Sequence, residues 1–224
     1  MNNWEAIIFD MDGLLVDTEV VWTEAESMLL AARGFRYDEE HPRSVVLGLR
    51  LDEFFEKLCD LFGFQEDYDR LNEELLDYMA ALVPDKVVKK PGAAELLDYV
   101  HRQGIPCAIA SSAPQSVIEA VVEGEGWSHI LKVRVSADAV ARGKPAPDVY
   151  LEAVRRLGVS PAGSLGLEDT PTGARAAVAA GLTCFVVPDS SNPWPVSFDG
   201  ITPHIFDSLH DVLKRLNGKI QTGK

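Results

Sequence analysis

The sequence is short of cysteine, with three residues of this type in 224. Cys59, Cys107 and Cys184 are widely spaced, and no Cys-x-x-Cys pair is present. An odd number at these spacings argues against a disulfide framework and against a zinc site, and it fits a reducing cytoplasm. Because Cys107 and Cys184 lie in apolar runs typical of strands, we expect both in the hydrophobic core.

Long hydrophobic runs are also missing. The first apolar run, residues 6–9, is too short for a signal peptide and leads directly into charged residues. No apolar stretch reaches the ~18 residues that a membrane-spanning helix needs. We therefore expect a cytoplasmic protein that does not cross a membrane.

Positive charge is scarce as well, because 21 Lys and Arg residues stand against 35 Asp and Glu residues, a formal net charge of -14. Such a surface repels nucleic acids and anionic membranes, so neither is an expected partner. An acidic surface commonly serves solubility. It also repels a phosphate substrate, so any phosphate site must obtain positive charge from a metal ion, a lysine or helix N-termini.

What the sequence does have is a regular alternation of short apolar runs with helical patterns. The apolar runs have the length of strands and cover residues 6–9, 107–110, 133–136, 164–167 and 183–187. Helices are expected at 92–103, 114–123, 147–157, 171–180 and 208–218. The alternation predicts an α/β fold, in which a Rossmann-like parallel sheet carries helices on both faces.

The alternation breaks between residues 18 and 83, where three amphipathic segments follow one another without a strand pattern. We therefore predict two domains. Residues 1–16 and 87–224 form the Rossmann-like core, and residues 17–86 form a helical domain inserted after the first strand.

Polar side chains follow several of the predicted strands. Asp10 and Asp12 come after the first strand, Ser111 after the second, and Glu168 with Asp169 after the fourth. Ligands of open parallel sheets bind beyond the carboxyl ends of the strands. These residues therefore predict one binding site at that edge of the sheet.

The first chemical motif is DMDGLLVDT, residues 10–18. Paired carboxylates at a buried strand end are costly unless a cation joins them. An extended chain would aim Asp10 and Asp12 the same way, and Gly13 would let the chain turn with its amides near an anion. The alternative is an ordinary strand-to-turn DxDG sequence.

The second motif, LGLEDTPTG, supplies the adjacent carboxylates Glu168 and Asp169. Together with Asp10 they are hard oxygen ligands of the kind that suits Mg²⁺. The alternative is that Asp169 or Thr170 only caps the helix that begins at Pro171. Capping would leave Glu168 unexplained.

Two further motifs offer groups for an anion. In ASSAP, Ser111 ends a strand just before a helix start at Pro114, which makes it either an anion ligand or an N-cap. In RGKPAPD, Lys144 stands between Gly143 and Pro145. Lys144 is either a solvated surface charge or the positive charge that a phosphate site needs.

These four motifs, in this order and spacing, resemble the haloacid dehalogenase superfamily in its phosphatase and phosphomutase branch, and the helical insertion resembles that superfamily's small α-helical cap. The likeness covers nearly the whole chain. It implies that Asp10 is a covalent nucleophile that forms an aspartyl phosphate, with Asp12 as its acid/base partner. It also implies that Mg²⁺ is held by Asp10, the Asp12 carbonyl, Glu168 and Asp169.

By the same resemblance, Ser111 would bind the transferring phosphoryl group with help from Gly13 and Ser112, and Lys144 would balance its charge. The substrate would be a small phosphorylated metabolite, and the cap would select it. The cap residues expected to contact the substrate are Trp22, Leu47, Gly48 and Arg50.

Departures from the family's patterns narrow the range of reactions expected for this chain. Asp12 argues against halide displacement. β-Phosphoglucomutases carry His at the position that matches Trp22, and Arg50 is displaced by one position from their cap arginine, so a phosphatase is favoured over a phosphomutase.

The segments DTEVVW (residues 17–22) and LGLRLDE (residues 47–53) are more similar to hexitol and 2-deoxyglucose 6-phosphate phosphatases. Pseudouridine 5′-phosphatase-like and phosphoglycolate phosphatase-like enzymes stay open. A non-catalytic sugar-phosphate-binding protein is a further alternative, although it would be expected to lose Asp10, Asp12 or Lys144. We expect a monomer or a weak dimer.

Overall fold

The computed structural model describes residues 4–37, 51–189 and 196–218. The internal contacts divide the chain into two compact units, Met1–Asp17 with Val88–Lys224 and Thr18–Val87. The first is called the core unit and the second the helical unit below. The role of the helical unit as a substrate-selecting cap stays a prediction.

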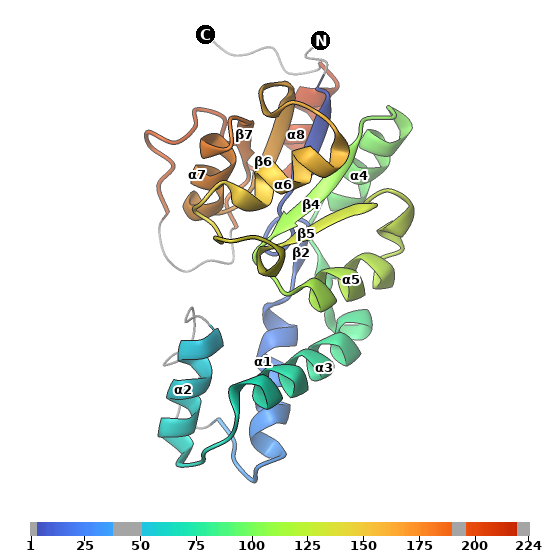
Figure 1. Cartoon of the computed structure of the whole chain (residues 1–224). Coiled ribbons are helices and arrows are strands. Elements are labelled where there is room, and N and C mark those ends of the chain that lie inside the picture. Colours follow the sequence, from blue (N-terminus) through green and yellow to red (C-terminus); the bar gives the residue numbers. More distant parts are fainter. Residues whose placement is uncertain (1–3, 38–50, 190–195, 219–224) are drawn as a thin grey trace. The chain divides into compact units, whose positions relative to one another are not determined.

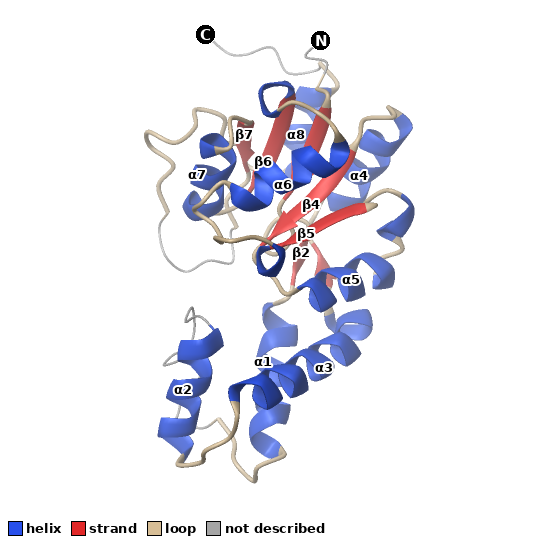
Figure 2. Cartoon of the chain, in the orientation of Figure 1, coloured by secondary structure: helices blue, strands red, loops and turns tan. Residues whose placement is uncertain are grey.

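The core unit is built on a five-stranded parallel sheet of order β5-β4-β1-β6-β7 (Figure 2). The strands lie where the apolar runs predict them and are β1 (Ala6–Phe9), β4 (Cys107–Ser111), β5 (Val133–Ser136), β6 (Ser164–Glu168) and β7 (Thr183–Val186). Every residue of β1, β4 and β6 is buried. Strands covered on both faces need apolar residues at every position, which explains why these segments are continuous runs rather than alternating patterns.

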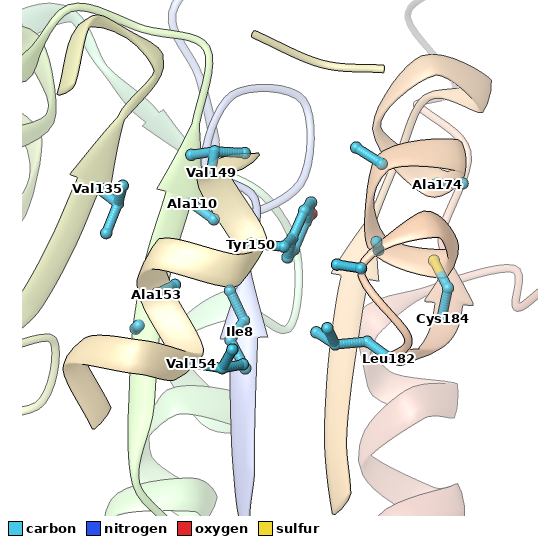
Figure 3. Close-up of a cluster of buried hydrophobic side chains, with 14 of the residues drawn as sticks. Ile8, Ala110, Val135, Val149, Tyr150, Ala153, Val154, Ala174, Leu182 and Cys184 are labelled. Carbon is cyan, nitrogen blue, oxygen red and sulfur yellow. The ribbon is translucent and has the colours of Figure 1, made fainter. Parts of the chain in front are cut away.

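Helices cover both faces of this sheet, as the alternation predicts. They are α4 (Ala93–Arg102), α5 (Gln115–Gly124), α6 (Asp148–Leu157), α7 (Pro171–Ala179) and α8 (Leu209–Leu216), with single 3₁₀ turns at Trp127–His129, Ala137–Ala139 and Pro161–Gly163. Helices α6 and α7 lie on one face, and α4 and α8 pair on the other (Figure 1). The layer under α6 and α7 is a continuous apolar cluster that includes Ile8, Val149, Tyr150 and Leu182 (Figure 3).

The register of the sheet places the ends of three strands at one level. Phe9 of β1 pairs with Ile109 of β4 and Leu167 of β6. The amide of Asp10 then donates to the Leu167 carbonyl at 2.9 Å. The residues that follow these positions, Asp10 and Glu168, are thereby fixed next to each other at the carboxyl edge of the sheet.

A second, two-stranded sheet joins β2 (Val16–Asp17) to β3 (Val88–Lys89) in antiparallel pairing, where the chain leaves the core unit and returns to it. The sequence does not predict it, because a two-residue strand is too short to show a hydrophobic period. The pairing continues in the bond from the Lys90 amide to the Leu15 carbonyl at 2.9 Å. It fixes both ends of the insertion to the core unit.

The helical unit contains α1 (Glu19–Ala31), α2 (Leu51–Phe62) and α3 (Tyr68–Lys86), and no strand occurs within its described residues. Helices α1 and α3 pack together through buried residues spaced about four apart, which are Val21, Ala25, Leu29, Leu71, Leu75 and Met79. None of the helices in the described parts of the chain is both long and apolar enough to cross a membrane.

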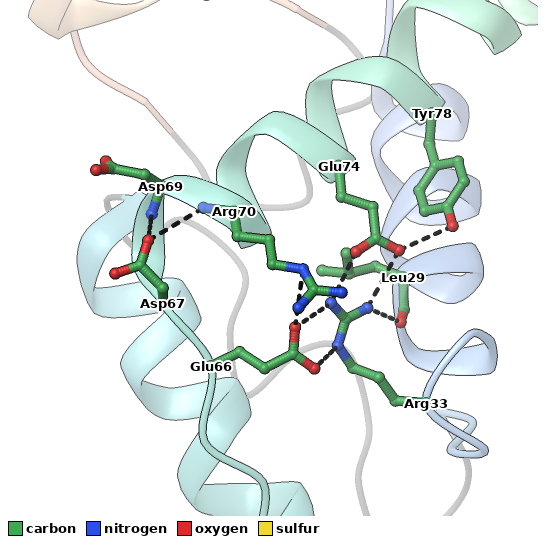
Figure 4. A network of polar contacts seen from close by, with 8 residues as sticks. All are labelled: Leu29, Arg33, Glu66, Asp67, Asp69, Arg70, Glu74 and Tyr78. Carbon is green, nitrogen blue, oxygen red and sulfur yellow. Dashed lines mark hydrogen bonds and ion pairs between the residues drawn. The ribbon is translucent and has the colours of Figure 1, made fainter.

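Arg33 ties the helical unit together (Figure 4). Its guanidinium donates to both carboxylate oxygens of Glu66 at 2.7 and 2.8 Å and to Glu74 Oε2 at 2.7 Å. It also donates to the Leu29 carbonyl at 2.7 Å, and Tyr78 supports Glu74 at 2.9 Å. The end of α1 is thus linked to α3 and to the segment before it by charge-assisted bonds.

We expect Arg33→Met to lower the free energy of unfolding of the helical unit by about 2–3 kcal/mol, because it leaves two carboxylates without their cation. Arg70→Met is the matched control. The Arg70 side chain is 75% exposed and reaches Glu66 only at 4.0 Å, so its removal should cost less than about 0.5 kcal/mol. Urea unfolding measures both variants, and equal losses would contradict the role given to Arg33.

Candidate functional site

Three carboxylates meet at the carboxyl edge of the core sheet. Asp10 follows β1, Glu168 ends β6, and Asp169 follows it. One oxygen from each lies within 4.8 Å of the others, and all three residues are at most 6% exposed. The sequence predicts this cluster, and the register of β1 against β6 is what assembles it.

Lys144 supplies the positive charge of the site. Its ammonium donates to Asp10 Oδ1 at 2.6 Å and to Glu168 Oε1 at 2.5 Å, and its side chain is 6% exposed. Lys144 is therefore a buried partner of the acidic cluster and not a solvated surface residue. One ammonium still faces three carboxylates, so the fully ionised cluster keeps an excess of two negative charges.

The excess of negative charge shifts the pKa values of the cluster. Burial, with the repulsion of Asp10 and Glu168, raises the pKa of Asp169 to about 9. Burial also raises the pKa of Asp10 to about 7, against the attraction of Lys144. For Lys144, burial alone would lower the pKa, but the charges of Asp10 and Glu168 outweigh it and raise the pKa. The site is short of positive charge without a further cation.

The surroundings of Asp169 are a second indication that the cluster lacks a cation. Its Oδ1 is buried and has no hydrogen-bond partner among the residues that the structure describes. An unsatisfied buried carboxylate oxygen is costly in protein interiors. Next to Asp10 it offers the hard oxygen ligands that a divalent cation prefers. The donor set, the orphaned oxygen and the charge excess all fit such an ion.

Both carboxylate oxygens of Glu168 accept hydrogen bonds. Tyr150 donates to its Oε1 at 2.6 Å, while the Asp169 amide and the Thr170 hydroxyl approach Oε2 at 3.3 and 3.4 Å. Thr170 also caps α7, accepting from the Gly173 amide at 3.1 Å. Thr170 therefore serves both as the predicted cap and as a contact of the cluster.

Gly173 leaves the space in which the Glu168 carboxylate lies. A Cβ added there would stand 2.0 Å from Glu168 Oε1. Sequence reasoning misses both Gly173 and Tyr150. The glycine of TPTG at the start of a helix is a signal for the first, since glycine costs helix stability unless space requires it, whereas nothing in the sequence marks Tyr150.

Gly13 lies in close contact with a member of the acidic cluster. Its φ is +82°, and a Cβ there would meet Asp169 Oδ2 at 2.2 Å. The Gly13 amide donates to the Val16 carbonyl at 2.8 Å. This amide is thus paired inside the turn, and the contact of Gly13 with a phosphoryl group stays a prediction.

The alternation that would aim Asp10 and Asp12 the same way requires an extended strand, but β1 ends at Phe9. Asp12 lies in the turn that follows, where it forms an isolated bridge with Val16 and stays half-buried. Asp10 therefore stands at the end of the strand, and Asp12 stands in the connection that leads away from it.

Ser111 is the last residue of β4 and is buried, and its hydroxyl accepts from the Ala113 amide at 3.1 Å. It therefore does not cap α5, whose N-cap is Pro114. Ser112 is exposed beside it. Ser136 holds this loop by donating to the Ala113 carbonyl at 2.7 Å. The loop presents Ser111 and Ser112 at the end of the strand next to β1.

The predicted substrate contacts of the insertion belong to the helical unit. Trp22 is a half-buried residue of α1. Leu47, Gly48 and Arg50 lie outside the described residues. Their contact with a substrate stays a prediction.

The raised pKa values predict how the metal-free protein responds to pH. Asp169 has an ordinary pKa of 3.8 and a folded value of about 9, so between these values the folded state holds more protons than the unfolded state. Stability is then greatest below the ordinary pKa and is lost as the pH rises toward the folded pKa. In EDTA, we expect the melting temperature to fall from pH 6 to pH 9.

Asp169→Asn should flatten this decline and should be more stable than the wild type at pH 9, because the uncompensated charge is gone. Asp98→Asn, at an exposed position of α4, is the control and should keep the wild-type decline. Identical declines in all three proteins would contradict the charge imbalance described here.

Comparison with known protein families gives one match that spans most of the chain. The model of the haloacid dehalogenase-like hydrolase family matches residues 7–187. The match includes both acidic motifs, Ser111 and Lys144.

Curated relatives extend this likeness. The chain is 31% identical over 188 residues to hexitol phosphatase B of Escherichia coli, covering 82% of this chain and 83% of that protein. It is 30% identical to a phosphorylated carbohydrates phosphatase of Thermotoga maritima, covering 80% and 82%. It is 32% identical to a bifunctional riboflavin kinase/FMN phosphatase of Arabidopsis thaliana over 94% of this chain, but it spans only 53% of that relative.

Among solved structures, CbbY from Rhodobacter sphaeroides in complex with phosphate superposes with a TM-score of 0.78 at 29% identity, covering 93% of this chain and 96% of that one.

Proposed function

The chain belongs to the haloacid dehalogenase-like hydrolase family and is an enzyme, and on this premise we propose that it is a Mg²⁺-dependent phosphatase of a small phosphorylated metabolite. The observation that carries the proposal is the buried cluster of Asp10, Glu168 and Asp169 with Lys144 between two of its members. Carboxylates, a lysine and a place for a divalent cation are the parts that phosphoryl transfer uses.

The proposed substrate class is supported by the names of the relatives and by the net charge of the chain. Two of the relatives are named for hexitol and for phosphorylated carbohydrates, which supports a sugar or sugar-alcohol phosphate here. A net charge of -14 disfavours polyanions such as nucleic acids. A cytoplasmic location and a monomeric or weakly dimeric state belong to the same proposal.

The residues for Mg²⁺ are Asp10 and Asp169, with the Asp12 carbonyl and Glu168. Asp169 Oδ1, which is buried without a partner among the described residues, gives the strongest support for this set. When bound, the ion would neutralise charge on the phosphoryl oxygens and favour the ionised form of Asp10. That second effect matters because burial alone raises the pKa of Asp10 to about 7.

In the first half-reaction, a carboxylate oxygen of Asp10 attacks phosphorus and the bond from phosphorus to the ester oxygen breaks. Asp12 donates its proton to the departing oxygen, so the alcohol leaves neutral and Asp12 becomes a carboxylate. Lys144 lies 2.6 Å from Asp10 Oδ1. It stabilises the negative charge gathered on Asp10 and the phosphoryl group, and Ser111 and Ser112 complete the phosphoryl contacts.

In the second half-reaction, Asp12 takes a proton from water as the water oxygen attacks phosphorus. The bond between phosphorus and Asp10 breaks, orthophosphate leaves, and Asp10 returns as a carboxylate. Both aspartates then have their starting protonation states, so the cycle consumes one water for each ester.

A phosphomutase would use a sugar hydroxyl in place of that water. Trp22 stands where β-phosphoglucomutases carry His, which favours water as the acceptor. A non-catalytic binding protein would not need the buried pairing of Lys144 with Asp10, which is costly to desolvate.

We expect p-nitrophenyl phosphate to be hydrolysed with Mg²⁺ and not with EDTA. Asp10→Asn should lower kcat at least about 10³-fold, because the amide cannot act as the nucleophile. Asp98→Asn should keep wild-type activity. Release of phosphate that persists in Asp10→Asn or in EDTA would count against the enzyme proposed here.

Asp12→Asn tests the proton transfer. Because an alkyl leaving group needs protonation more than p-nitrophenolate does, we expect a loss of at least about 10²-fold with an alkyl phosphate and a clearly smaller loss with p-nitrophenyl phosphate. Initial rates with both esters give the comparison. Equal losses would remove Asp12 from the role of acid.

A panel of phosphorylated sugars and sugar alcohols, scored for released phosphate, tests the substrate class. β-Glucose 1-phosphate with its bisphosphate activator belongs in the panel and is scored for isomerisation too. We expect phosphate release without isomerisation. Isomerisation without phosphate release would establish the phosphomutase alternative.

A further inference from the structure

Tyr150 is the buried residue of the site that the proposed chemistry does not use. It lies in α6 and is fully buried, packed in the core cluster below that helix (Figure 3). Its hydroxyl donates to Glu168 Oε1 at 2.6 Å. A buried tyrosine needs a polar partner for its hydroxyl, and here that partner is a carboxylate of the acidic cluster.

The same carboxylate oxygen also receives Lys144. The Lys144 ammonium is 2.5 Å from Glu168 Oε1 and 5.2 Å from the centroid of the Tyr150 ring. Tyr150 therefore contacts both members of this ion pair, through a charge-assisted hydrogen bond to one and a cation–π contact to the other.

The two oxygens of Glu168 have different surroundings. Oε1 has two short donors, Tyr150 and Lys144, whereas Oε2 is approached only at 3.3 and 3.4 Å by Asp169 and Thr170. The short bonds fix the direction of the carboxylate. Among the residues that the structure describes, removing the tyrosine hydroxyl would leave Lys144 as the only short donor to Oε1.

We propose that Tyr150 is a positioning residue, whose hydroxyl fixes Glu168 so that Lys144 is held against Asp10. The inference rests on the proposed phosphatase function for its effect on rate, but the contact itself does not depend on that function. Lys144 acts on charge that develops during phosphoryl transfer, so its displacement lowers kcat more than it weakens ground-state binding.

The kinetic test is Tyr150→Phe, which keeps the ring and removes only the hydroxyl. With p-nitrophenyl phosphate and Mg²⁺, we expect kcat to fall about tenfold while KM changes less than about twofold. Tyr99→Phe is the matched control, because Tyr99 is a half-buried tyrosine whose hydroxyl contacts only the Leu216 carbonyl at 3.4 Å among its described bonds. It should leave both constants unchanged.

A second measurement asks whether Tyr150 acts through Glu168. We expect Tyr150→Phe to lower the urea midpoint of unfolding in the wild-type background. In a Glu168→Ala background the hydroxyl has already lost its acceptor, so the same change should be neutral or stabilising. Equal losses in both backgrounds would show that the Tyr150 hydroxyl stabilises the protein independently of Glu168 and would overturn the proposal.

The two measurements distinguish failure of the proposed function from failure of the positioning role. If the wild type shows no Mg²⁺-dependent hydrolysis, the proposed function fails, and the unfolding cycle still decides whether Tyr150 holds Glu168. If the wild type is active and Tyr150→Phe keeps kcat within about twofold, the positioning role is wrong while the phosphatase stands.

Discussion

The geometry of the candidate site is set by three buried carboxylates and one buried ammonium. Asp10, Glu168 and Asp169 converge with Lys144 at the carboxyl edge of a parallel sheet. Such an arrangement is unfavourable by itself, because burial and mutual repulsion raise the pKa values of Asp10 and Asp169. The divalent cation of the proposed function would offset this imbalance and give the charged cluster a chemical use.

The fold supplies the rigid frame that such a cluster needs. The register between β1 and β6 sets Asp10 beside Glu168, while the cap of α7 and the space at Gly173 fix the Glu168 carboxylate. Gly13 lets the turn after β1 approach Asp169 closely. Two glycines, Gly13 and Gly173, and one threonine, Thr170, therefore preserve the geometry of the carboxylates.

Much of this could be predicted from the sequence. Buried strands show as apolar runs, and DMDG and LEDT follow directly where two of them end. What escapes prediction depends on contacts between distant residues. The Tyr150 contact joins two motifs that look independent in the sequence, the two-residue strands β2 and β3 are too short for a period, and the path of the turn at Asp12 follows from where β1 stops.

In the proposed reaction, Asp10 receives the phosphoryl group of the substrate. Brief mixing of the protein with Mg²⁺ and a phosphorylated sugar alcohol, followed by acid quenching, digestion and peptide mass spectrometry, tests it most directly. We expect a phosphoryl group on the peptide that contains Asp10, and its absence when EDTA replaces Mg²⁺. Metal-dependent turnover with no phosphoryl group on that peptide, or with the group on another residue, would contradict it.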